Sequence, residues 1–250
     1  MAKSTTPPNA GKPPIARGKG RNEDSEAPMS CCKNFTTWSI EQLTDYDRCP
    51  LKAYLKHTSK LNARVKNEKK CGCRMVEHII KYVQGKIDRV PKGLESFGDE
   101  LKFLRSQNVK SELKLAITNN FEICKSGDYS NMWCEAEIDS AYFDSEMLTI
   151  IDFQAETSHI SSIPERMSLF ALICLVNFPN VEKIKVELWN VEKGTISYLS
   201  KRIEELPAMK KYWTKRTRKM LADRSFKPTP SLTVKHCCPH SNHYGGQCEY

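Results

Sequence analysis

Residues 133–154 read WCEAEIDSAYFDSEMLTIIDFQ, and this stretch decides the predicted fold class. Apolar and polar residues alternate over residues 133–140, which is typical of a half-buried β-strand. Residues 147–153 form a short apolar run that predicts a second strand, and the polar pair at 145–146 predicts a turn between them. The stretch therefore predicts a hairpin within a sheet.

Further helices and strands are expected around this hairpin. Ser39, followed three residues later by Gln42, has the pattern of a helix N-cap with a capping box. The order of the elements predicts an α/β fold with a mixed central sheet flanked by helices. A short helix is expected after Ser39, longer helices at residues 70–84, 92–106, 165–178 and about 203–224, and further strands at residues 112–118, 183–190 and 195–199.

The composition limits the size of the domain and the kinds of partner to be expected. The chain has 250 residues and a mass of 28.7 kDa, which suits one medium domain with appendages. Its 39 lysines and arginines exceed its 30 aspartates and glutamates. The resulting net charge of +9 favours a polyanionic partner such as nucleic acid, and ordinary surface solubility explains it equally well. Residues 1–34 have prolines and glycines but almost no large apolar side chains, so we expect a disordered basic tail before a domain at residues 35–250.

The 11 cysteines are expected to be buried apolar side chains or metal ligands rather than disulfides. The first residues are polar without the apolar region of a signal peptide, and no apolar run is long enough to span a membrane. We therefore expect a cytoplasmic protein in a reducing compartment, with no membrane partner. Cys237, Cys238 and Cys248 cluster near the end of the chain, and Cys49 could supply a fourth thiolate. Thiolates at this density suit zinc or an iron-sulfur cluster.

Asp139 and Asp152 are the candidate ligands for a hard metal ion. Each lies at the end of one hairpin strand, so both carboxylates could share a magnesium ion that activates water for phosphodiester hydrolysis. Strand alternation places Gln154 and Glu156 on the face of Asp152. From spacing alone, the stronger alternative is that both acids are simply solvated at a turn.

The segment from Trp38 to Pro50, WSIEQLTDYDRCP, resembles the start of RecB, AddB and CRISPR-associated exonuclease domains of the PD-(D/E)XK nuclease superfamily. Further matches follow in the same order, among them residues 136–139, residues 150–153 and the terminal cysteines, so the resemblance covers residues 36–250. The pattern around Cys238 and Cys248 is most similar to phage versions. The resemblance implies a restriction-endonuclease-like core, magnesium-dependent cutting of DNA at strand ends or in single strands, and a role in recombination.

The resemblance also assigns site residues, several of which are replaced. Asp139 and Asp152 would hold the metal and face the helix that carries Val76, and Gln154 stands where the family has a lysine. The family's histidine and glutamate fall on Val76 and Ile80, and its later glutamine and tyrosine fall on Arg166 and Phe170. The resemblance implies a four-iron cluster on Cys49, Cys237, Cys238 and Cys248. A cysteine expected at Lys235 is missing, and zinc with His236, His240 or His243 is the alternative.

Two functions remain open from the sequence. The first is a nuclease that retains activity through Asp139, Asp152 and Gln154. The second is a catalytically inactive DNA-binding or scaffolding protein of the same fold, which would bind phosphates through the basic helix at residues 203–224. The groups expected to contact DNA are Lys210, Lys211, Lys215, Arg216, Arg218 and Lys219 with the aromatic rings of Tyr212 and Trp213, and an exposed amphipathic helix without a ligand is the equal alternative.

Overall fold

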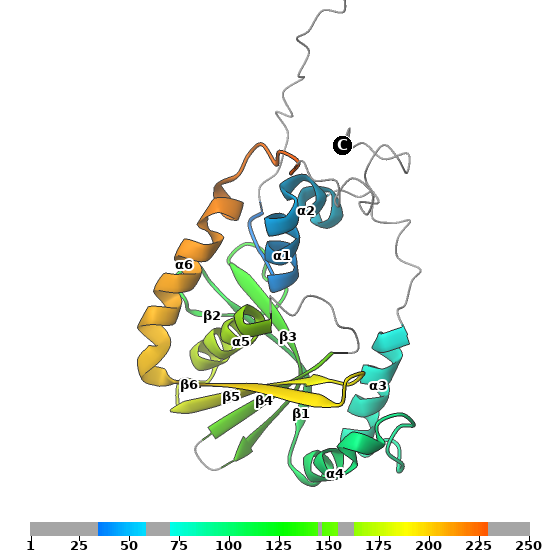
Figure 1. Cartoon of the computed structure of the whole chain (residues 1–250). Coiled ribbons are helices and arrows are strands. Elements are labelled where there is room, and N and C mark those ends of the chain that lie inside the picture. The colour runs from blue at the N-terminus through cyan, green and yellow to red at the C-terminus, as the bar shows by residue number, and fades with distance from the viewer. Residues whose placement is uncertain (1–34, 59–70, 145–146, 155–162, 230–250) are drawn as a thin grey trace, which may run out of the picture. The chain divides into compact units, whose positions relative to one another are not determined.

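The computed structural model describes the chain over residues 35–58, 71–144, 147–154 and 163–229 (Figure 1). A six-stranded sheet forms its centre, with the strands in the order β2-β1-β3-β4-β5-β6. These strands are β1 (Lys110–Ile117), β2 (Ile123–Cys124), β3 (Cys134–Asp144), β4 (Met147–Gln154), β5 (Lys183–Asn190) and β6 (Thr195–Arg202). The mixed α/β class predicted from the sequence is confirmed.

The pairing of the strands explains how the acid-bearing hairpin joins the rest of the sheet. β3 and β4 pair antiparallel, with Ser140 opposite Ile151 and Asp144 opposite Met147, so the predicted hairpin is confirmed. β4 and β5 pair parallel and are joined through a helix, which a parallel pair requires because the chain must cross back over the sheet. β1 pairs antiparallel with β3, and β6 pairs antiparallel with β5.

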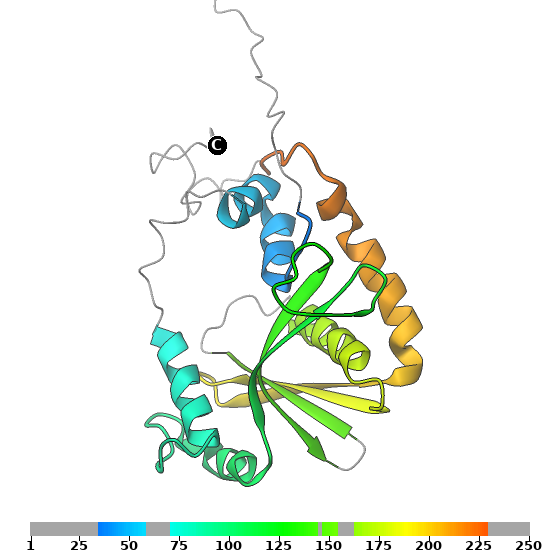
Figure 2. The ribbon, with the colours of Figure 1, turned by 180° about the vertical axis from the view of Figure 1, so that it is seen from behind.

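Helices pack on both faces of the sheet, as the opposite views in Figures 1 and 2 show. They are α1 (Ile40–Arg48), α2 (Pro50–His57), α3 (Cys71–Val83), α4 (Gly98–Ser106), α5 (Ile163–Asn177) and α6 (Leu206–Ala222), with short 3-10 turns at Glu95–Phe97 and Ile203–Glu205. The side chain of Ser39 accepts the N–H of Gln42, and the Gln42 side chain accepts the N–H of Ser39, so the predicted capping box starts α1.

Two apolar clusters divide the core between the faces. One cluster joins α5 to the sheet, to α1 and to α6, and it contains Trp38, Phe170 and Ile150. The other joins α3 and α4 to the sheet and contains Leu101, Ile151 and Phe153. Because neighbouring residues of β4 belong to different clusters, both faces of this strand are buried.

Two elements were not predicted from the sequence. α2 follows α1 after a break at Cys49, with Pro50 in its first turn, where proline is tolerated because the N–H it lacks would have no helical partner. β2 is a two-residue strand paired with the end of β1. The helix expected at residues 92–106 divides into the 3-10 turn Glu95–Phe97 and α4.

An aromatic cluster ties the ends of the described chain together. Trp213 of α6 is fully buried and stacks on Trp38, with ring centroids 5.7 Å apart. Phe226 stacks on Tyr54 of α2, with centroids 4.7 Å apart. The prediction that Trp213 is available to stack on DNA bases is therefore wrong, because the apolar side of α6 faces the core.

The expectation of a tail at residues 1–34 lies outside the described residues. Within the described ranges, none of the helices is both long enough and apolar enough to cross a membrane.

Candidate functional site

Asp139 and Asp152 lie on neighbouring strands at the same end of the β3–β4 hairpin. The β3–β4 pairing reaches Ser140 opposite Ile151, and Asp139 and Asp152 are the residues next to this last pair. The Oδ2 atom of Asp139 accepts a hydrogen bond of 2.7 Å from the backbone N–H of Phe153. This bond fixes the Asp139 carboxylate beside β4.

The Asp152 side chain points to the face of the sheet that α5 covers. Its neighbours Ile151 and Phe153 pack with α3 and α4 on the opposite face, and alternation along the strand directs Asp152 away from them. The prediction that both acids face the helix carrying Val76 is therefore wrong for Asp152. Val76 is a partly buried residue at the edge of the α3–α4 cluster.

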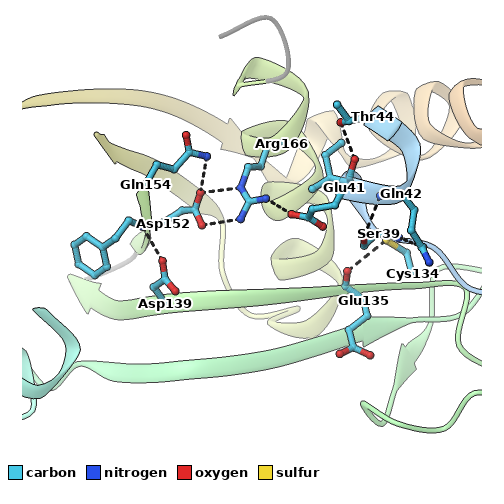
Figure 3. A network of polar contacts seen from close by, with 12 residues as sticks. Ser39, Glu41, Gln42, Thr44, Cys134, Glu135, Asp139, Asp152, Gln154 and Arg166 are labelled. Carbon is cyan, nitrogen blue, oxygen red and sulfur yellow. Dashed lines mark hydrogen bonds and ion pairs between the residues drawn. The ribbon is translucent and has the colours of Figure 1, made fainter. Parts of the chain in front are cut away.

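Arg166, in the first turn of α5, binds both oxygens of Asp152 (Figure 3). Its Nε donates to Oδ2 at 2.7 Å, and a terminal nitrogen donates to Oδ1 at 2.9 Å. The other terminal nitrogen forms an ion pair with Glu41 of α1. The guanidinium also lies over the ring of Phe170, 4.8 Å from its centroid. Arg166 therefore connects the sheet, α5 and α1 through one planar group.

Burial changes the electrostatics of this cluster. The side chain of Asp152 is 5% exposed and that of Arg166 is 22% exposed, so water screens their interaction weakly. Burial, together with the negative charge of Asp152, raises the pKa of Asp139 to about 7. Although burial opposes it, Asp152 raises the pKa of Arg166 above its ordinary value, which keeps the guanidinium charged.

Gln154 lies on the face of Asp152, as strand alternation predicted. Its Nε2 donates to the Oδ2 atom of Asp152 at 3.3 Å. A neutral amide supplies no positive charge for phosphate or water, so Gln154 does not replace the lysine that the resemblance implies. Glu156, expected on the same face, lies outside the described residues.

The acids as folded do not fit a divalent metal ion. Both oxygens of Asp152 are bound by Arg166, and one oxygen of Asp139 is bound by Phe153. Within the described residues, no group of at least three histidine, cysteine or acidic side chains is placed to hold a metal. A magnesium ion needs several oxygen ligands with free lone pairs, and this arrangement offers few.

From the sequence, Arg166 was noted only as a position where the resembled family has a glutamine. Glu41 was not predicted to be part of the site. A signal was present, because an arginine at the start of an otherwise apolar helix must find an anion or water. Its two partners lie 14 and 125 residues away in the sequence. Spacing along the chain could not have identified them.

A cavity of about 340 Å³ opens beside Arg166 and Glu41. Its lining includes Glu135 and Glu137 of β3 as well as Glu41, so acids outnumber the single arginine there. Glu41 pairs with Arg166 and Glu137 pairs with Lys114, so the charge of these two glutamates is compensated. The cavity therefore offers a phosphate no unpaired cation among its lining residues.

The basic helix α6 has a group of exposed cations without ion pairs in the described residues. Lys211, Lys215, Arg218 and Lys219 of α6 are exposed and have no ion pair with any residue in the described ranges; we call them the α6 cation stripe. Arg216 does not belong to it, because its guanidinium pairs with Glu165 of α5 and Asp47 of α1. Lys210 is half-buried over the ring of Phe121.

Cys49 is the one proposed cluster ligand that the described ranges include. It is buried at the junction of α1 and α2 and forms no disulfide. Phe226 packs against Tyr46 and Tyr54 of the same two helices, which brings the C-terminal end of the described chain to this junction. Cys237, Cys238 and Cys248 lie outside the described residues.

The raised pKa of Asp139 predicts a pH-dependent stability. An unfolded aspartate titrates near 3.9 and Asp139 in the folded chain near 7, so unfolding releases a proton between about pH 4 and pH 7. The resulting contribution to stability is present below pH 4 and is lost as the pH rises to about 7. We expect the Asp139→Asn variant to gain stability relative to the wild type across this window, measured by urea denaturation at several pH values.

Asp128→Asn is the control for this measurement. Hydrogen bonds from Ser130 and Asn131 lower the pKa of Asp128, so its contribution to stability is lost only below about pH 4. The difference between the wild type and Asp128→Asn should therefore stay constant from pH 4 to pH 8. A wild-type and Asp139→Asn difference that stays constant from pH 4 to pH 8 would show that Asp139 is ionised throughout.

Comparison with known proteins gives distant structural similarity only. No family model and no curated protein matches the chain. A crystal structure from Eubacterium rectale, provisionally described as an exonuclease, has a TM-score of 0.45 and 13% sequence identity, covering 89% of this chain and 94% of that chain. The crystal structure of the protein SSO0001 has a TM-score of 0.35 and 13% identity, covering 78% of this chain and 82% of that chain. At this level of similarity, the function has to be argued from the residues of the chain itself.

Proposed function

We propose that this protein binds DNA through the α6 cation stripe and does not hydrolyse DNA at Asp139 and Asp152. It would then be a non-catalytic DNA-binding or scaffolding member of the PD-(D/E)XK superfamily. The observation that carries the binding proposal is the set of exposed cations on α6 that lack an ion pair in the described part of the chain. The ion pair between Arg166 and Asp152 supports the absence of hydrolysis.

The geometry of α6 suits contact with a phosphate backbone. Met209, Trp213, Thr217 and Met220 are the buried residues of the helix, and they anchor it to the core. The cation stripe occupies the remaining surface from Lys211 to Lys219, which corresponds to about 12 Å at 1.5 Å per residue. Duplex DNA carries about one charge per 1.7 Å of axis, so a stripe of this length can meet several phosphates.

Contact through phosphates also limits what the stripe can recognise. Trp213 is buried, and the hydroxyl of Tyr212 donates to Glu165 at 2.6 Å, which ties that ring to α5. Stacking on unpaired bases therefore has little support from α6. We propose binding with little dependence on base sequence, and a preference for strand ends or single strands remains a hypothesis from the resemblance.

Charge reversal in the stripe tests the binding proposal. The double variant Lys215→Glu, Arg218→Glu should bind duplex DNA more weakly, because it loses two cations that release counterions from the phosphates. We expect the slope of log affinity against log salt to fall by about 2 in magnitude. Fluorescence anisotropy with a labelled duplex at several salt concentrations measures both effects.

The matched control reverses two exposed lysines at other positions. Lys92 precedes α4 and Lys193 lies in the β5–β6 turn, so Lys92→Glu with Lys193→Glu changes the net charge equally. This variant should keep the wild-type salt slope. Unchanged binding after reversal in α6, or an equal loss in both double variants, would contradict the proposed surface.

Hydrolysis is tested separately from binding. Purified wild-type protein in excess over labelled duplex or single-stranded DNA should release no product with magnesium or manganese, because Arg166 binds both oxygens of Asp152. The assay is denaturing gel electrophoresis over a long time course. Metal-dependent cutting that Asp152→Asn abolishes would establish the nuclease function instead.

We also propose that Cys49 joins Cys237, Cys238 and Cys248 in a structural iron-sulfur or zinc site. The supporting observation is that Phe226 packs against α1 and α2 beside the junction that holds Cys49. Thiolates from both ends of the domain would then hold the C-terminal segment, and the free energy of metal binding would contribute to folding.

Metal analysis of anaerobically purified protein tests this site. We expect stoichiometric iron with sulfide, or stoichiometric zinc, in the wild type, and a loss of that metal with a lower melting temperature in Cys49→Ser and Cys248→Ser. Cys174→Ser is the control, because Cys174 is equally buried but lies in α5, so it should lower stability while the metal content stays. A metal-free wild type, or full metal content in Cys49→Ser, would contradict the proposal.

A further inference from the structure

We infer that Arg166 is a built-in cation that takes the position of a divalent metal beside Asp152 and Asp139. The inference concerns the acid pair, and it holds whether or not α6 binds DNA. It makes the site a fixed structural ion-pair cluster that a single substitution at Arg166 would convert into a metal site.

The guanidinium of Arg166 has carboxylate partners on two sides, as a bound metal ion would have. It is bound by Asp152 on one side and Glu41 on the other (Figure 3). The ring of Phe170 also lies against the guanidinium, with the ring centroid 4.8 Å away. The two parallel N–H donors match the two oxygens of a carboxylate, which gives the pair a defined geometry. Asp152 therefore has its charge compensated without any bound ion.

The charge balance of the acid pair agrees with this role. Arg166 supplies one positive charge where a metal ion would supply two. Asp152 is compensated directly, because Arg166 donates to both of its oxygens. Asp139 is held instead by the backbone N–H of Phe153.

A second arginine, Arg216, can be compared with Arg166. Arg216 of α6 also bridges two helices, because it pairs with Asp47 of α1 and Glu165 of α5. Glu165 and Arg166 are neighbours at the start of α5, so the two ion-pair clusters share this turn. Of these two arginines, only Arg166 binds an acid of the pair, Asp152, and Arg216 is therefore a matched control.

Removal of the guanidinium leaves two adjacent carboxylates without a cation. The Arg166→Gln variant keeps a polar side chain of smaller size, and its amide oxygen is itself a ligand that hard cations accept. We expect this variant to bind one manganese ion per chain, and we expect no saturable binding at these acids in the wild type. Bound metal should also raise the melting temperature of the variant, since a ligand that binds only the folded state stabilises it.

Isothermal titration with manganese, followed by thermal melting with and without the ion, measures this difference. Arg216→Gln should behave as the wild type does, and the double variant Arg166→Gln, Asp152→Asn should lose the new site. A folded Arg166→Gln protein that binds no manganese, or an equal gain in Arg216→Gln, would overturn the inference.

The wild type gives an independent test if Arg166→Gln does not fold. Bound manganese broadens the NMR signals of nearby amides, and the amide of Phe153 lies beside the acid pair because it donates to Asp139. We expect no saturable broadening of the Phe153 signal in the wild type. Saturable broadening of the Phe153 signal in the wild type would show that manganese binds at the acids in the presence of Arg166. This result would overturn the inference.

Discussion

The burial of α5 against the sheet is the constraint on which the rest of the structure depends. This helix joins the parallel strands β4 and β5, and its residues from Leu169 to Val176 are all buried. A helix that is apolar on every side must be covered on every side, and the sheet, α1 and α6 provide that cover. The charged side chains of this helix, Glu165 and Arg166, therefore lie at its start, before the buried stretch.

The charge clusters at the start of α5 follow from that packing. A buried carboxylate such as Asp152 is stable only with a paired cation and hydrogen bonds, and Arg166 supplies both. Glu165 in turn pairs with Arg216 and so ties α6 to the same turn. The two clusters position three helices against one end of the hairpin.

The molecule separates its negative and positive surfaces. Glutamates line the cavity beside the acid pair, whereas the α6 cation stripe lies on the outer side of the domain. The proposal of binding without hydrolysis rests on the cations of this stripe, which are unpaired within the described residues, together with the ion pair of Asp152.

The sequence by itself determined the strands other than β2, the hairpin, the capping box of α1 and the face of Gln154, because each depends on residues close together in the chain. It also identified Asp139 and Asp152 as neighbours. Tertiary structure alone decided that Arg166 of α5 binds both Asp152 and Glu41, since those two partners come from β4 and α1. It likewise decided that Trp213 is buried, because periodicity shows that a helix has two sides but does not show which aromatic residues the rest of the fold covers.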